Sequence, residues 1–119
     1  MGESFRDLKV WQRAIQLSVS IDQLTSAFPD LERFGLTNQL RRASVSVASN
    51  IAEGYGRTTR GEYLQFSGHA RGSNFELQTQ LVISEQLGFG SAAIRQSTAE
   101  LSEEVSKMLV AIMKKLQKS

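Results

Sequence analysis

The sequence has no cysteine, and only one of its 119 residues is a histidine. Without cysteine there is no disulfide framework and no thiolate metal site, which suits a reducing cytoplasm. The longest wholly apolar run, Met108 to Met113, is far shorter than the ~20 residues that span a bilayer. The N-terminal segment also lacks the charged-then-apolar layout of a signal peptide. We therefore expect a soluble, cytoplasmic protein with no membrane partner.

The single histidine, His69, bears on several kinds of active site. Helical bundles can bind two iron ions through paired Glu-x-x-His motifs, but the residue three before His69 is Phe66 and there is no second imidazole. Ser67 and Ser73 lie near His69 in sequence, yet no sequence signal places a carboxylate to orient the imidazole. The sequence therefore predicts a protein that is not an enzyme, with no catalytic, metal-binding or cofactor-binding residues and no cofactor.

Apolar residues recur at helical spacing in four segments of the chain. In the first segment, steps of three and four residues lead from Val10 to Phe28, and Pro29 then disfavours further helix. No alternating strand pattern competes over a useful length, so we expect an all-α, antiparallel up-and-down four-helix bundle. The expected helices span about residues 7–27, 37–55, 59–87 and 91–117 of a single domain, residues 1–119.

Residues suited to helix capping stand at the expected helix starts. Ser4, Thr37 and Ser91 each carry a hydroxyl that can accept a hydrogen bond from a first-turn amide. Thr59 and Glu62 have the spacing of a capping box. These positions predict where four helices begin.

A second apolar stripe on the first helix contains Trp11 and Ile15, about 100° from the first stripe. One interpretation is that its large side chains cap the core of their own bundle. The other is that the stripe packs against a second subunit, and this interpretation predicts a homo-oligomer. The stripe comprises Leu8, Trp11, Ile15 and Val19, and Leu109, Val110 and Met113 broaden the apolar face of the fourth helix.

Small residues on the second and third helices would let two backbones approach closely. Gly72 within a helix costs about 0.8–1 kcal/mol relative to alanine unless tight contact offsets it. We therefore expect Gly72→Leu to disrupt packing or assembly. Asn50 lies in the apolar register of the second helix, where a buried amide could fix the helix register. We expect this structural role for Asn50 rather than a catalytic one.

The arginines allow two interpretations. If the turn between the second and third helices centres near Arg57, Arg42 lies level with Ser73, and Arg41 or Arg42 can pair with Glu76 within a subunit or across an interface. Alternatively, basic side chains form a surface that attracts phosphates, and symmetry would repeat this surface around an oligomer. The candidate nucleic-acid-binding residues are Arg57, Arg60, Arg71, Lys107, Lys114, Lys115 and Lys118.

Two segments, LTNQLRRASVSVASNIAEGYG (Leu36 to Gly56) and ARGSNFELQTQL (Ala70 to Leu81), carry a resemblance that extends over nearly the whole chain. The sequence resembles the four-helix-bundle proteins encoded in intervening sequences of bacterial 23S ribosomal RNA genes, and their relatives, the accessory proteins of diversity-generating retroelements. The resemblance implies a homopentamer around a central opening. The retroelement relatives resemble positively charged rings that engage nucleic acid and a reverse transcriptase, which implies a nucleic-acid partner.

Taken together, the pattern and the resemblance predict a non-enzymatic, ring-like homo-oligomer, a pentamer by resemblance, that binds RNA or a nucleoprotein. The acidic band of Glu100, Glu103 and Glu104 argues against a uniformly basic surface. The alternative hypothesis is a protein-interaction scaffold whose charges only keep the assembly soluble.

Overall fold

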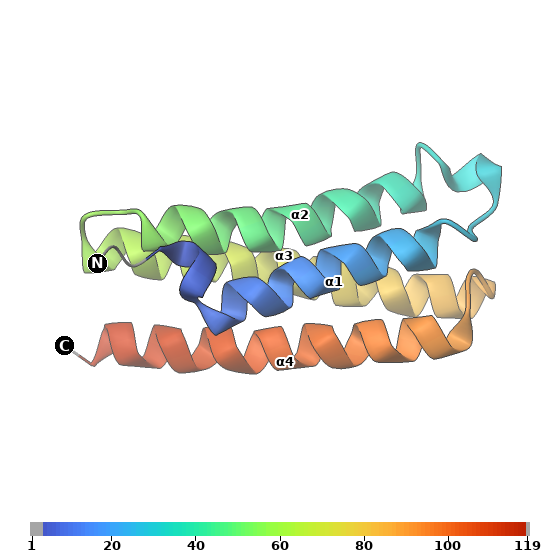
Figure 1. The fold of residues 1–119 in the computed structure, drawn as a ribbon. Coiled ribbons are helices and arrows are strands. Elements are labelled where there is room, and N and C mark those ends of the chain that lie inside the picture. Colours follow the sequence, from blue (N-terminus) through green and yellow to red (C-terminus); the bar gives the residue numbers. More distant parts are fainter. Residues whose placement is uncertain (1–3, 119) are drawn as a thin grey trace.

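The computed structural model describes residues 4–118 and shows four long helices, each antiparallel to the next (Figure 1). Each helix packs against its two neighbours, so the four close around one core that is elongated, 46 × 27 × 23 Å. No strand occurs in the described part of the chain, and the predicted all-α four-helix bundle is confirmed. The helices are α1 (Lys9–Thr25), α2 (Leu36–Tyr55), α3 (Arg60–Leu87) and α4 (Ala92–Gln117), with short 3-10 turns at Phe5–Asp7 and Asp30–Glu32.

Side-chain caps are observed at two of the four helix starts. Ser4 caps the 3-10 turn at Phe5–Asp7, whereas α1 begins at Lys9 without a side-chain cap. The Ser91 hydroxyl accepts from the Ile94 amide at 3.2 Å, and the Thr59 hydroxyl accepts from the Glu62 amide at 3.1 Å. Thr37 does not cap α2, because the helix already begins at Leu36 and Thr37 is buried within it. The Leu36 amide instead donates to the Glu32 carboxylate at 3.4 Å.

The core follows the predicted stripes. In α1 the side chains from Val10 to Leu24 that recur every three or four residues are almost fully buried. Phe28 turns back into the core after the helix has ended, which seals that end of the bundle. Among residues 4–118, no helix combines the length and apolar character that a bilayer-spanning segment needs. The buried apolar residues are Val10, Ala14, Leu17, Ile21, Leu24, Phe28, Leu36, Leu40, Ala43, Val47, Ala48, Ile51, Ala70, Leu77, Leu81, Val105 and Leu109.

The second stripe of α1 divides between the two predicted roles. Leu8 and Trp11 pack against the subunit's own core, and the Trp11 ring meets the Phe5 ring edge to face at 5.2 Å. Ile15 and Val19 stay on the surface, 37% and 54% exposed. Only the second pair is therefore free to meet another molecule.

A buried amide does link two helices, but it is Asn74 rather than Asn50. The Asn74 side chain donates to the Ser102 carbonyl at 2.9 Å and accepts from the Ser102 hydroxyl at 2.7 Å, which ties α3 to α4. Asn50 is half-buried and donates to Ser46 of its own helix at 2.9 Å. The α2 helix presents Ile51 to the core instead, because Ile51 also falls in the apolar spacing and carries no polar group.

The register between α2 and α3 is four residues away from the predicted one. Ser46, rather than Arg42, meets Ser73, with 2.8 Å between the hydroxyl oxygens. Helical side chains lean toward the N-terminus of their own helix, so the α2 residue that reaches a given α3 residue lies nearer the connecting turn than the backbone count suggests.

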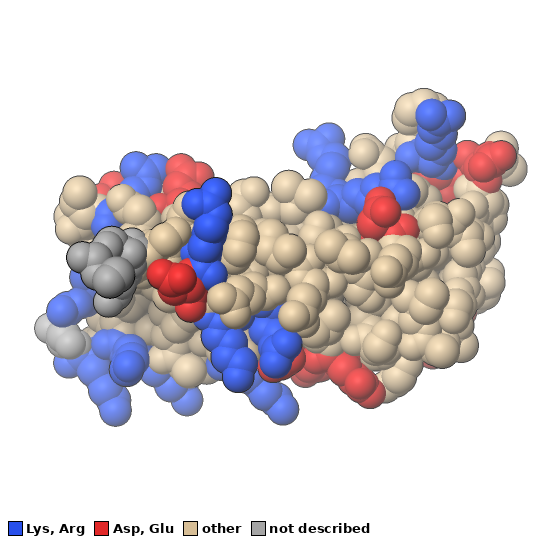
Figure 2. All heavy atoms as spheres, viewed as in Figure 1, with Lys and Arg blue, Asp and Glu red and all other residues tan. Residues whose placement is uncertain are grey.

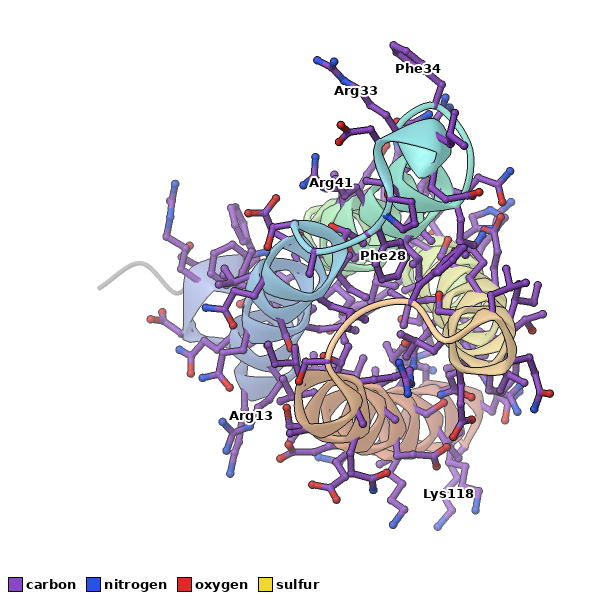
Figure 3. The ribbon with its side chains drawn as sticks, turned by 90° about the vertical axis from the view of Figure 1, so that its right-hand side faces the viewer. Arg13, Phe28, Arg33, Phe34, Arg41 and Lys118 are labelled. Atoms are coloured by element: carbon purple, nitrogen blue, oxygen red, sulfur yellow. The ribbon has the colours of Figure 1, made fainter. Side chains whose placement is uncertain are left out.

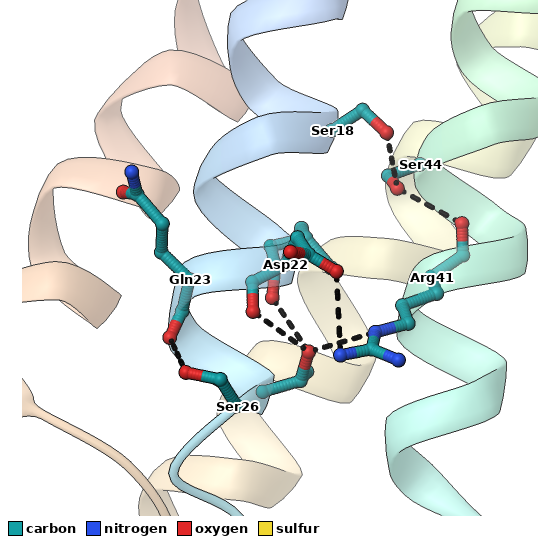
Figure 4. A network of polar contacts seen from close by, with 8 residues as sticks. Ser18, Asp22, Gln23, Ser26, Arg41 and Ser44 are labelled. Atoms are coloured by element: carbon teal, nitrogen blue, oxygen red, sulfur yellow. Dashed lines mark hydrogen bonds and ion pairs between the residues drawn. The ribbon is translucent and has the colours of Figure 1, made fainter.

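Arg41 points to α1 and not to α3 (Figure 4). Its Nε donates to the Thr25 hydroxyl at 3.1 Å, and its Nη2 lies 3.3 Å from the Asp22 carboxylate. No ion pair within 4.0 Å joins Arg41 or Arg42 to Glu76 in the described chain, so the predicted pairing is wrong within the subunit.

Gly72 is not the glycine at a close helix contact. A Cβ added at Gly72 would meet nothing within 4 Å, whereas one added at Gly54 would lie 2.9 Å from the Phe66 Cβ. Gly54 is buried where the end of α2 crosses the start of α3. The absence of a side chain is therefore needed at Gly54, and Gly72→Leu would meet no obstacle inside the subunit.

We expect Asn74→Ala to lower the free energy of unfolding by about 1–3 kcal/mol, because it removes both hydrogen bonds between α3 and the buried Ser102 and leaves the Ser102 hydroxyl without its acceptor. Asn50→Ala serves as the matched control and should cost less than about 1 kcal/mol, since its hydrogen bonds are half-exposed and within one helix. Urea unfolding of both variants checks the difference. Equal losses for the two variants would contradict the assignment of Asn74 as the inter-helix link.

The two glycines should respond in opposite directions to alanine. Gly54→Ala should destabilise the fold by about 1–3 kcal/mol because its methyl group overpacks against Phe66. Gly72→Ala should stabilise the helix by up to about 1 kcal/mol because it faces open space. Thermal unfolding of both variants measures the signs, and a stabilising Gly54→Ala would show that the contact is not tight.

Candidate nucleic-acid interface

Basic side chains gather at the end of the bundle where the described chain begins and ends, and Figure 2 shows a second group of them near the connection between α1 and α2 (Figures 1 and 2). Antiparallel packing brings together the start of α1, the end of α2, the start of α3 and the end of α4. Residues 4–13, 53–62 and 107–118 carry nine Lys and Arg side chains against three Asp and Glu. This part of the molecule, named the basic end below, therefore carries most of the excess positive charge.

The opposite half of α3 and α4 has the reverse character. Residues 76–104 carry five glutamates against Arg95, and Arg95 is engaged with the Phe89 carbonyl at 2.7 Å. Glu104 pairs with Arg13 of α1 at 3.0 Å, and Glu103 lies exposed on the same helix. The bundle is thus electrically polar along its long axis.

The lysines at the end of α4 are the most open part of the basic end. Lys114, Lys115 and Lys118 are exposed and border a shallow hollow of about 500 Å³. Neither these lysines nor Arg60 and Lys107 form an ion pair within 4.0 Å in the described part of the chain. Their charge is therefore available to a phosphate.

Two of the predicted nucleic-acid-binding residues are engaged elsewhere. Arg57 lies 3.0 Å from the Glu53 carboxylate and 4.0 Å from that of Glu62, and its guanidinium stacks 4.6 Å from the Phe66 ring centre. The Arg71 guanidinium lies 4.9 Å from the Phe75 ring centre. The structure thus brings together Arg60 and the lysines but assigns Arg57 to packing.

Sequence reasoning missed Lys9, which is exposed in the first turn of α1 and belongs to the basic end. The predicted up-and-down topology could have indicated this residue. In an up-and-down bundle of four helices, the start of the first helix lies at the same end as the close of the fourth.

Aromatic side chains pack beneath the basic end. The Tyr55 and Tyr63 rings meet at 6.2 Å, and the Phe66 ring meets the exposed His69 ring at 5.6 Å. Burial, followed by the charge of Tyr55, raises the pKa of Tyr63 above its ordinary 10.0. Tyr63 therefore remains a neutral hydrogen-bonding group at pH 7. Within residues 4–118, no three His, Asp or Glu side chains cluster as metal ligands.

A second surface feature is an apolar face on the outer side of α3, named the α3 patch. Its spacing places it opposite the buried face of the same helix, which contains Leu77 and Leu81. A helix that is apolar on two sides is better suited to contacts on both sides than to solvent. The α3 patch consists of Phe75, Val82, Ile83 and Leu87, which are 44–55% exposed.

The structure defines an all-α four-helix bundle with a basic end and an apolar outer face. The sequence matches the family model described as 23S rRNA-intervening sequence protein over residues 6–111, and the chain belongs to this family. The family predicted from the two sequence segments is confirmed. No curated protein matches the chain.

A similar solved structure is that of a protein with unknown function from the S23 ribosomal protein family of Bacteroides thetaiotaomicron. The two sequences are 20% identical, and the superposition has a TM-score of 0.78, covering 88% of this chain and 98% of the other. At this level of identity, the likeness shows a shared fold.

Proposed function

We propose that this chain is a non-enzymatic, homo-oligomeric binding module whose basic end binds the phosphate backbone of RNA, alone or within a nucleoprotein. The observation that carries the proposal is the set of exposed cations at one end, above all Lys114, Lys115 and Lys118, which lack ion-pair partners in the described chain. The resemblance to retroelement accessory proteins also supports a nucleic-acid partner. The proposal assigns no catalytic residue and places the protein in the cytoplasm with its RNA.

Self-association would increase the effect of these cations. Phosphate binding that is independent of sequence depends on the summed charge, because each phosphate contact releases counterions. Copies related by a rotation axis that runs along the bundle would present their basic ends on the same side and so create a ring of positive charge. The α3 patch, with Ile15 and Val19 of α1, supplies apolar surface for such contacts. A pentamer is the state implied by the family resemblance.

The second candidate is a protein-interaction scaffold with no nucleic-acid ligand. The observation in its favour is the α3 patch itself, since large apolar side chains exposed on one face are typical of protein contacts. Affinity capture of a stable protein partner, unchanged by nuclease, would favour the scaffold.

The RNA proposal is tested by reversing charge at the end of α4. Lys114→Glu with Lys115→Glu should weaken binding to a structured RNA hairpin at least about tenfold at ~50 mM salt, and should make the salt dependence shallower. Lys114→Arg with Lys115→Arg is the matched control, because it keeps the charge and should keep the affinity. Electrophoretic shifts over a salt series measure both. Absence of any shift by the unaltered protein at ~50 mM salt would refute the proposal.

Self-association is tested by placing a charge in the α3 patch. The unaltered protein should sediment at micromolar concentration with several times the 13.2 kDa mass of one chain. Ile83→Asp should shift the assembly toward the monomer, because a buried unpaired carboxylate is strongly unfavourable. Ala93→Asp adds the same charge to an exposed position of α4 and should leave the mass unchanged. A well-behaved monomer for the unaltered protein would contradict self-association.

A further inference from the structure

A polar hollow of about 610 Å³ lies between α2 and α3, away from the basic end. From Arg42 in this hollow to the end of α2 at Tyr55, the helix extends roughly 20 Å. The hollow is lined by two carboxamides, a guanidinium, a hydroxyl, a carboxylate and an aromatic ring at its rim. These groups belong to Asn38, Gln39, Arg42, Ser46, Glu76 and Phe34.

The charged groups of this hollow have few partners inside the subunit. Arg41, one residue earlier on α2, is held by Asp22 and Thr25 (Figure 4). Arg42 has no ion pair within 4.0 Å in the described chain, and the Glu76 carboxylate receives one long hydrogen bond of 3.5 Å from Gln80. Arg42 and Glu76 therefore retain hydrogen-bonding capacity for a ligand.

A solvent-exposed aromatic side chain lies at the rim of the hollow. Phe34 is 86% exposed, and the Arg33 guanidinium lies 5.6 Å from its ring centre. Figure 3 shows both side chains projecting from the connection between α1 and α2, whereas Phe28 points into the bundle. A phenyl ring beside a guanidinium presents a flat surface that suits a planar, uncharged ligand with a nearby negative charge.

Two guanidinium groups border the hollow. Arg33 lies beside the Phe34 ring and Arg42 belongs to the lining, next to the neutral amides of Asn38 and Gln39. The start of α2 adds no free anion site, because the Leu36 amide already donates to the Glu32 carboxylate at 3.4 Å.

We propose that this α2–α3 hollow binds one unpaired nucleotide of a single-stranded RNA segment. The base stacks on Phe34, which any nucleobase can do because each has a flat π face. The amides of Asn38 and Gln39 and the carboxylate of Glu76 pair with the base edge. Arg42 contacts the adjoining phosphate. This inference rests on the proposed RNA binding and adds a preference for unpaired nucleotides.

The test compares the binding of two fluorescent RNA probes that contain the same hairpin. One probe ends in a blunt duplex, and the other carries an overhang of about eight unpaired nucleotides, within the site sizes of single-strand binders. We expect the overhang probe to bind more tightly. Phe34→Ala should weaken binding of the overhang probe at least about fivefold, the lower limit for one lost stack, and should leave the blunt probe unaffected.

Leu31→Ala is the matched control, because Leu31 is an exposed apolar residue of the same connection, 95% exposed, and does not line the hollow. It should bind both probes like the unaltered protein. Arg42→Gln should weaken the overhang probe more than the blunt probe. Fluorescence anisotropy at fixed salt gives all these affinities, and sedimentation shows whether each variant keeps its assembly state.

Different outcomes separate the two proposals. If neither probe binds, RNA binding as a whole fails. If both probes bind equally tightly, and only the double variant Lys114→Glu with Lys115→Glu fails to bind them, the basic end binds RNA and the hollow inference is overturned. The hollow inference is also overturned if Phe34→Ala lowers the mass of the assembly, which would make the hollow a subunit contact. Adenosine monophosphate that binds alone more tightly than the overhang would identify a free nucleotide as the ligand instead.

Discussion

The antiparallel packing of consecutive helices is the constraint on which the rest of the structure depends. The connections between α2 and α3 and between α3 and α4 contain four residues each, so neighbouring helices must reverse direction. Reversal brings residues 57–60 to the same end of the bundle as the last turn of α4, although half the chain separates them. The unequal distribution of charge along the sequence then becomes an unequal distribution between the two ends of the molecule.

The α3 helix differs from its neighbours because both of its sides carry apolar residues. One side contributes Leu77 and Leu81 to the core, and the other is the α3 patch. Between them, Asn74 fixes how α3 sits against α4 through two hydrogen bonds to Ser102. This polar link supplies specificity that apolar packing alone does not give to a helix with two suitable faces.

The sequence predicted the four helices because their apolar spacing is regular and their ends carry glycine or capping hydroxyls. It did not predict that Asn74, rather than Asn50, is the buried amide, since this depends on small rotations of helices whose apolar spacing fits two orientations. The engagement of Arg57 was partly visible, because Glu53 lies four residues earlier, at the spacing of a helical ion pair. The hollow beside Phe34 had no sequence signal. Its lining comes from the connection between α1 and α2 and from the helices α2 and α3, whose observed register differs by one turn from the predicted one.

The separation of charge along the bundle has an electrostatic consequence for an assembly whose single rotation axis runs along the bundles. Such an assembly aligns the molecular dipoles side by side, and parallel dipoles in this arrangement repel one another. Added electrolyte screens this repulsion and also weakens attraction to phosphates. Ionic strength would thus act in opposite senses on cohesion between protomers and on capture of a polyanion, and the two processes would be best balanced at intermediate salt.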